Sequence, residues 1–220
     1  MKAMKKKLRK FLLMLSCGLL LMSLSVGVTV AYLTDTDSVK NTFTVGKVDI
    51  TMDENLVDTE TGKIEPGITD RVTENEYKIV PGRTIDKDPV IRVQPGSEES
   101  WLFIKIENGL AAIEAASETG ENGYKTIAEQ LVANGWKAVE GAEGVVYAKV
   151  AAANTAEGAG VVPYPTFTQF KVKGDIANAA IDEYEGKKIN VTAYAVQYEG
   201  FEENVAGAWA AISDVEYGVK

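Results

Sequence analysis

Carboxylate side chains are the candidate reactive groups of this chain. Close acidic pairs recur along the sequence: Asp35 with Asp37, Asp86 with Asp88, Glu98 with Glu99, Asp182 with Glu183, and Glu202 with Glu203. Two carboxyl groups can act as the acid and base of a glycosidase, and oxygen ligands of this kind also suit calcium. Because 32 of the 220 residues are acidic, such pairs are expected by chance. We interpret them as solvated loop carboxylates and expect no catalytic residue and no resident cofactor; a calcium site stays open, with no ligand assigned.

Imidazole and thiol chemistry have no support in the sequence. The chain has no histidine, and its single cysteine is Cys17. Without histidine there can be no Ser-His-Asp triad and no His-liganded zinc. No GxxxxGK[ST] motif is present and no GxGxxG follows a predicted strand, so nucleotide binding is not indicated. We therefore expect a protein that is not an enzyme.

The first 31 residues have the layout of a secretory signal peptide. Residues 1–10 include six basic side chains and no acidic one, and residues 11–30 are uncharged. We predict cleavage by a signal peptidase between Ala31 and Tyr32, or one residue earlier. The apolar stretch also approaches the roughly 20 residues that span a bilayer, so an uncleaved anchor is an alternative. A lipoprotein cut at Cys17 is another, although a poor lipobox precedes it. Cleavage and anchoring both place the remaining chain outside the cell, secreted or at its surface.

The remaining chain is strongly acidic. Of the 23 basic residues, six lie in the leader, so residues 32–220 carry 17 basic and 32 acidic side chains and a net charge of −15. A domain with this negative charge is repelled by the phosphates of nucleic acids, and it has no electrostatic attraction to anionic lipid surfaces. We expect no nucleic-acid partner, and membrane contact only through the leader before cleavage. Self-association would have to rest on backbone pairing and apolar contact, or on cations that screen the carboxylates.

Alternation of apolar and polar side chains predicts a mainly all-β domain. Predicted strands, rich in β-branched and aromatic residues, lie at 43–52, 77–80, 89–94, 101–107, 145–150, 167–172 and 189–198. Several of them are closed by Pro-Gly turns, which indicates a jelly-roll or β-sandwich fold. We find no internal repeat and no sign of a second folded domain.

Two short helices are predicted in the connections, at 124–132 and 205–212, from apolar residues at helical spacing. Residues 175–184 fit either a third helix or a loop. We expect residues 53–75 to form a long exposed connection. Trp101 and Trp209 lie on apolar faces and are expected in the core, whereas Trp136 follows a helix stop and has no assigned place.

The end of the leader and the segment after it carry a family pattern. Residues 30–35 read VAYLTD and residues 41–50 read NTFTVGKVDI. They resemble the start of the SipW-dependent exported proteins, a small residue with A-[FY]-[FL]-[ST]-D followed by N-x-F-x-x-G-x-[VL]-x-[IL]. This family includes the biofilm fibre protein TasA and camelysin. Residues 87–106 and 191–197, the latter followed by Trp209, are similar to the same group more loosely.

The resemblance implies a Gram-positive exported protein cut by a dedicated signal peptidase, with three parts: a signal peptide at 1–31, an extended segment at 32–42 and a jelly-roll domain at 43–220. In TasA-like members the new N-terminus inserts as a strand into the next subunit and builds a fibre. Carried onto this sequence, the candidate donor strand consists of Tyr32, Leu33, Thr34, Asp35, Thr36, Asp37, Ser38 and Val39. The implied partners are further copies of the chain or related fibre proteins.

Two other functions stay open beside a fibre subunit or fibre accessory. Camelysin-like relatives are labelled metallopeptidases, but no histidine is present here to hold zinc, and an all-carboxylate zinc site would be unusual. The second alternative is a monomeric binding module anchored at the cell surface.

Overall fold

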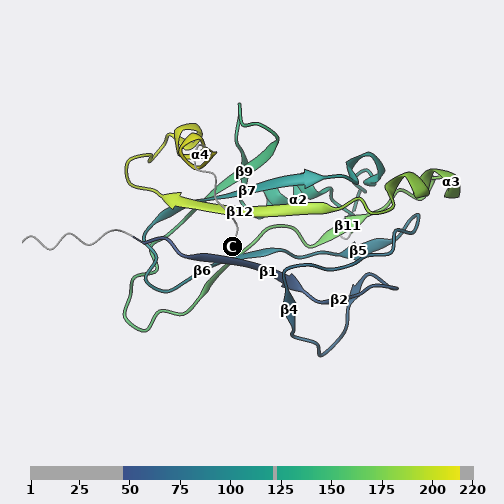
Figure 1. Cartoon of the computed structure of the whole chain (residues 1–220), viewed down its shortest axis with the longest axis horizontal. Coiled ribbons are helices and arrows are strands. Elements are labelled where there is room, and N and C mark those ends of the chain that lie inside the picture. The colour runs from purple at the N-terminus through teal and green to yellow at the C-terminus, as the bar shows by residue number, and fades with distance from the viewer. Residues whose placement is uncertain (1–46, 121–122, 214–220) are drawn as a thin grey trace, which may run out of the picture. The chain divides into compact units, whose positions relative to one another are not determined.

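The structure, a computed structural model, describes residues 47–120 and 123–213 (Figure 1). The predicted signal peptide, the cleavage site between Ala31 and Tyr32, and the candidate donor strand from Tyr32 to Val39 lie outside the described residues. The predictions for these segments therefore stay predictions.

Two antiparallel sheets form the layers of a β-sandwich, with the core between them (Figure 1). The first sheet has the order β10 (Val162–Pro165), β6 (Val90–Val93), β1 (Ile50–Asn55) and β4 (Arg71–Val72). The second has the order β12 (Ile189–Gln197), β7 (Ser100–Asn108), β9 (Val145–Ala151) and β8 (Lys137–Ala138). Two smaller pairs are β11 (Gln169–Lys171) with β5 (Thr84–Asp86), and β2 (Val57–Asp58) with β3 (Lys63–Ile64). The predicted mainly-β sandwich is confirmed.

Short helical segments lie in the connections, as predicted: η1 (Ala111–Ile113), α2 (Ile127–Ala133), α3 (Asn178–Ile181), η2 (Asp182–Tyr184) and α4 (Val205–Ser213). Helix α2 begins later than the sequence predicts, because Thr126 caps it. The Thr126 hydroxyl accepts a bond from the Glu129 N–H at 3.4 Å, and the Glu129 carboxylate accepts one from the Thr126 N–H at 3.2 Å. This reciprocal capping box fixes the helix start.

The predicted connection at 53–75 is only partly exposed, and here the prediction is wrong. It contains the end of β1 and the short strands β2, β3 and β4, and Glu54 and Val57 within it are buried. The Asn75 side chain holds the segment together by accepting a bond from the Val57 N–H at 3.1 Å and donating one to the Asn55 carbonyl at 2.9 Å. Such long-range side-chain bonds let two-residue strands form without a local alternation pattern.

The predicted strand at 77–80 is also wrong. Within the described ranges no strand pairs with it, although the Lys78 N–H donates to the Thr59 carbonyl at 3.3 Å. Its apolar residues Tyr77 and Ile79 are half-buried and pack against the core, which accounts for the alternating pattern.

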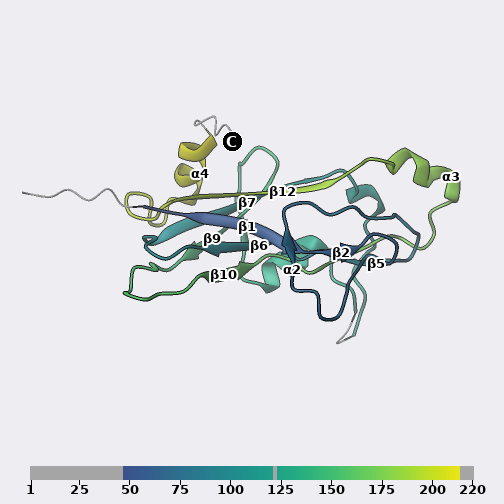
Figure 2. The same ribbon diagram turned by 60° about the horizontal axis from the view of Figure 1, so that its bottom comes forward.

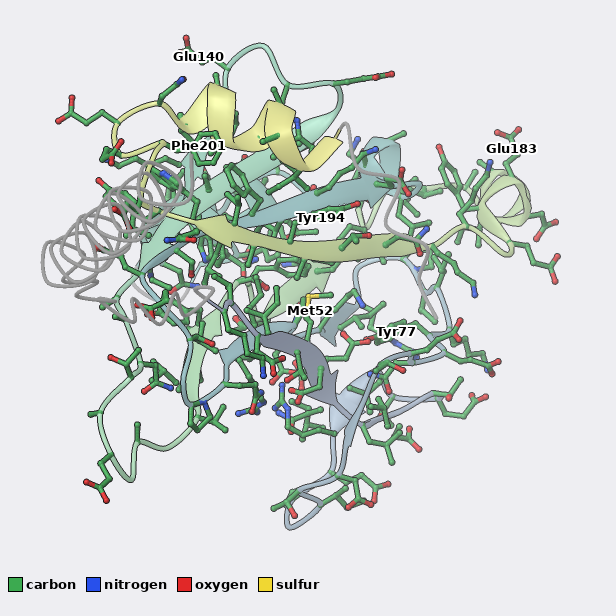
Figure 3. All side chains as sticks on the ribbon, turned by 60° about the vertical axis from the view of Figure 1, so that its left-hand side comes forward. Met52, Tyr77, Glu140, Glu183, Tyr194 and Phe201 are labelled. Carbon is green, nitrogen blue, oxygen red and sulfur yellow. The ribbon has the colours of Figure 1, made fainter. Side chains whose placement is uncertain are left out.

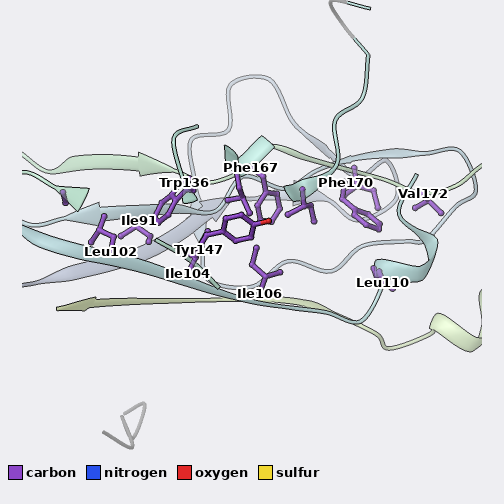
Figure 4. Close-up of a cluster of buried hydrophobic side chains, with 14 of the residues drawn as sticks. Ile91, Leu102, Ile104, Ile106, Leu110, Trp136, Tyr147, Phe167, Phe170 and Val172 are labelled. Carbon is purple, nitrogen blue, oxygen red and sulfur yellow. The ribbon is translucent and has the colours of Figure 1, made fainter. Parts of the chain in front are cut away.

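The main core lies between the sheets and contains large side chains from both layers (Figure 4). Its fully buried members include Ile91, Val93, Leu102, Ile104, Trp136, Phe167, Phe170 and Val172. Trp136 is only 1% exposed, and its Nε1–H donates to the Pro165 carbonyl at 2.9 Å. A second cluster on the other face of the second sheet includes Trp101, Phe103 and Trp209, covered by α4. The core positions predicted for Trp101 and Trp209 are therefore confirmed, and both stay partly exposed.

Candidate functional site

Strand β12 forms one edge of the second sheet. All nine of its residues pair with β7, from Ile189 opposite Asn108 to Gln197 opposite Ser100. On its other side, no strand of the described residues pairs with β12. An unpaired strand edge of this length offers a row of backbone donors and acceptors to another chain.

Hydrogen bonds at the two ends of β12 show which backbone groups face outward. The Tyr198 N–H donates to the Glu99 carbonyl at 2.9 Å, and the Gly109 N–H donates to the Lys188 carbonyl at 3.0 Å. Both bonds follow the β12–β7 register, so the even-numbered residues of β12 bond to β7. The backbone groups that point away from β7 belong to Ile189, Val191, Ala193, Ala195 and Gln197. We call this row the open edge.

The side chains of the open edge face the core. Ile189, Val191, Ala193 and Ala195 are half-buried and pack against the main core cluster. A strand added here would therefore place every second side chain over the edge of that core, because side chains alternate between the faces of a strand.

Among the described residues, strand β1 also has an edge toward the same side that is largely without a partner strand. The Gln94 N–H donates to the Asp49 carbonyl at 2.9 Å, so Thr51 and Asp53 bond to β6 and the backbone groups of Ile50 and Met52 point away from it. Strand β4 covers only the last two residues of β1. Figure 3 shows the Met52 side chain extending from β1 toward β12.

A groove of about 1280 Å³ lies between these two edges. One wall contains Met52, Glu54 and residues 72–79, and the other contains residues 185–192, which include the start of β12. Three buried core residues, Ile85, Leu110 and Phe170, also line it. The groove therefore has an apolar floor next to the outward-facing backbone groups of Ile189 and Val191, at the start of the open edge. An added strand requires both features, since it bonds through its main chain and places alternate side chains in pockets.

A buried ion pair stands in the groove wall. Lys87 Nζ lies 2.9 Å from Glu54 Oε2, and the two side chains are only 11% and 6% exposed. The same ammonium group lies 5.3 Å from the centre of the Tyr77 ring. Burial, reinforced by the charge of Glu54, raises the pKa of Tyr77 well above its usual value, so its hydroxyl stays protonated.

The Tyr77 hydroxyl makes no hydrogen bond of normal geometry among the described residues, although the side chains of Asn75 and Glu54 lie close to it. It lines the groove, its oxygen is buried, and no hydrogen-bond partner is present in the described part of the chain. A buried polar group left unpaired costs about 1–3 kcal/mol. An acceptor brought into the groove would relieve that cost.

Arginine side chains hold the neighbouring strands together. Arg92 Nε donates to the Asp53 carboxylate at 2.8 Å, and Arg71 from β4 donates to the same carboxylate. Burial would raise the pKa of Asp53, but these hydrogen bonds from Arg92 and Arg71 outweigh it and keep the pKa below its usual value. Asp53 therefore stays ionised to lower pH than a free aspartate and links β1, β4 and β6.

The acidic pairs singled out in the sequence do not converge on a metal. Asp88 accepts bonds from the Asn55 N–H at 2.8 Å and the Asn55 side chain at 2.6 Å, whereas Asp86 pairs with Lys63 at 2.7 Å. These two carboxylates are thus structural, not merely solvated as we predict from the sequence. Across 47–120 and 123–213, no group of three or more histidine, cysteine or acidic residues could hold a metal ion. Asp35 and Asp37 lie outside the described residues.

The described residues form a mainly-β sandwich in which one long edge strand, β12, has no partner strand on its outer side beside a groove. A family model described as camelysin metallo-endopeptidase matches residues 3–90, less than half of the chain. This match confirms the resemblance to the camelysin and TasA family predicted from the sequence. No curated protein and no solved structure matches the chain. In the part of the chain that the structure describes, no helix is long and apolar enough to cross a membrane.

The described residues do not fit the metal that the family description implies. Peptidase zinc sites combine three protein ligands, mostly histidine with a carboxylate or cysteine. This chain has no histidine, and no three of its described carboxylates gather into a group that could hold a metal ion.

Proposed function

We propose that this chain is an exported structural protein, a subunit or accessory of extracellular biofilm-matrix fibres that assembles by donor-strand addition. The observation that carries the proposal is the open edge of β12 beside the groove. Its partner is the N-terminal segment of a second copy, or of a related fibre protein.

The predicted donor strand suits this edge in length. Eight residues from Tyr32 to Val39 extend to roughly 26 Å at about 3.3 Å per residue, close to the span of the nine residues of β12. Main-chain bonds to the open edge would supply affinity, and the floor of the groove would take apolar side chains.

Head-to-tail addition of this kind gives an open filament, because donor and acceptor are different surfaces of one subunit. Cleavage by a dedicated signal peptidase would be the switch, since it frees the donor from the leader. The net charge of −15 on residues 32–220 favours dispersed subunits until backbone pairing joins them.

Deleting residues 33–39 from the full chain, with Ala31 and Tyr32 retained for cleavage, is expected to abolish fibres. The donor supplies the backbone groups that pair with the open edge, so without it each subunit should remain separate. Electron microscopy of the exported protein measures the outcome, and mass spectrometry of its N-terminus verifies cleavage. A full-length variant, Asp35→Pro with Asp37→Pro, removes donor N–H groups without shortening the segment and should behave alike. Unchanged fibres in both variants would contradict donor-strand addition. If the parent protein itself formed no fibres, the result would favour the alternative of a monomeric binding module.

The family description favours a second candidate, a cell-surface metallopeptidase. Cleavage of casein by the exported protein, lost on adding a chelator, would support this candidate over a purely structural role. The absence of histidine from the whole chain weighs against it.

A further inference from the structure

Strand β10 forms the outer edge of the first sheet (Figure 2). It pairs with β6, with Val162 opposite Val93 and Pro165 opposite Val90. No other strand of the described residues pairs with it, and Val162 is 38% exposed. The Pro165 carbonyl on this edge accepts a hydrogen bond from the Trp136 indole at 2.9 Å, so only part of the edge is open to another chain.

The backbone of β10 nevertheless lacks the donors that such pairing needs. The Thr166 N–H donates to the Pro89 carbonyl at 3.2 Å, in register with the β10–β6 ladder. Residues 162, 164 and 166 therefore face β6, and the two positions whose N–H would point outward are Pro163 and Pro165. Proline has no N–H, so this side of β10 offers no backbone donor.

Core packing does not explain the two prolines. Both are exposed, and each lies opposite a residue of β6 that belongs to the outer face, Arg92 for Pro163 and Val90 for Pro165. The core-facing residue between them is Tyr164, which packs against the main cluster. Proline at edge positions is a device by which sheets avoid pairing with other chains.

We infer that Pro163 and Pro165 close the β10 edge to strand pairing between copies of this chain. Combined with the proposed function, on which this second step rests, they remove the edge of β10 as an alternative to the open edge of β12. Growth is then linear, because a second accepting edge would let β10 strands of different subunits pair and join fibres side by side. The closure of β10 itself holds whether or not the chain forms fibres.

The test restores the missing donors with the variant Pro163→Thr and Pro165→Thr in the exported full-length chain. We expect fibres to associate laterally, with at least a twofold increase in mean width by electron microscopy. The matched control is Pro66→Thr with Pro95→Thr, which changes two exposed turn prolines and should leave the width unchanged. Fibre widths equal to those of the parent in a folded double variant would overturn the inference.

A second background separates the two proposals. In the chain lacking residues 33–39, strand donation is removed, so sedimentation velocity should show monomers for the parent and dimers or larger species for the threonine variant. If the threonine variant associates in this background, the result supports the closure of the β10 edge by its prolines. A parent protein that never forms fibres would overturn only the proposed function. The inference that the prolines close β10 would be overturned if the parent and the double threonine variant were both monomeric, with native circular dichroism spectra. The variants Pro163→Thr and Pro165→Thr, each made alone, would also have to be monomeric.

Discussion

Ala193→Pro should abolish fibre formation while leaving the subunit folded. The Ala193 N–H points away from β7 as part of the open edge, so proline there removes a donor that no strand of the described residues uses. Proline is tolerated at edge positions whose N–H faces outward. The added ring also obstructs the approach of a second strand. Electron microscopy and sedimentation of the exported protein should show monomers in place of fibres.

The same sheet provides a matched control at its opposite edge. Strand β8 pairs with β9, and the Val139 N–H donates to the Val146 carbonyl at 2.9 Å, so the N–H of the exposed Ala138 points outward. Ala138→Pro makes the same chemical change on an edge that we do not expect to accept a strand. Fibres should persist in that variant. Equal loss of fibres in both variants, or in neither, would contradict the assignment of β12 as the accepting edge.

Lys87→Met should lower the free energy of unfolding by about 3–5 kcal/mol, because it leaves the buried Glu54 carboxylate without its partner. Methionine preserves most of the side-chain length, so the loss reports chiefly on the unpaired charge. Urea unfolding monitored by circular dichroism measures it, and the variant lacking residues 33–39 avoids interference from fibres.

Two companion variants show whether burial is the cause. Replacing both partners, Lys87→Met with Glu54→Leu, should recover most of the stability, since no unpaired charge stays buried. Lys188 pairs with Glu74 at 2.6 Å on the surface, where both side chains are mostly exposed, and Lys188→Met should produce no resolvable change. A loss for Lys87→Met no larger than that for Lys188→Met would contradict the buried pair.

The long strands could be predicted from the sequence because their side chains alternate over many residues. Strands β7, β9 and β12 coincide closely with the predicted 101–107, 145–150 and 189–198. In each, β-branched and aromatic residues occupy a half-buried surface, which is the setting that β-propensity reflects. Helix α4 followed in the same way from its apolar spacing.

The short strands and the place of Trp136 could not be predicted. Strands β2, β3 and β4 have two residues each and depend on bonds between distant positions, such as that from the Asn75 side chain to the Asn55 carbonyl. Trp136 lies in the core because its indole N–H reaches the Pro165 carbonyl, 29 residues further along the chain. Neither kind of contact produces a periodic pattern in a short window.

The sequence indicated a donor segment, through its family resemblance, but not the edge that would accept it. Whether a strand is central or terminal depends on the order of strands in the sheet, which single-strand patterns do not specify. Two signals were nevertheless present. Residues 189–198 contain neither proline nor charge, whereas Pro163 and Pro165 alternate along the other edge. Edges closed to pairing usually carry proline or charge, so the contrast distinguishes the two.

Disulfide trapping between two single-cysteine preparations tests whether the N-terminal segment of one subunit pairs with β12 of another. The only natural cysteine, Cys17, lies in the predicted leader, so the cleaved protein would carry no thiol of its own. One preparation carries Thr192→Cys on the exposed face of β12, and the other carries Thr34→Cys, Thr36→Cys or Ser38→Cys in the donor. Side chains directly opposite on paired strands have Cβ atoms about 4.5–5.5 Å apart, close enough for a disulfide after small adjustments.

Mixed under oxidising conditions, at least one donor position should give a dimer band on a non-reducing gel that neither preparation gives alone. That result would place the N-terminal segment of one subunit against β12 of another. Fibres that form from the mixture without such a band, at all three donor positions, would contradict strand donation to this edge.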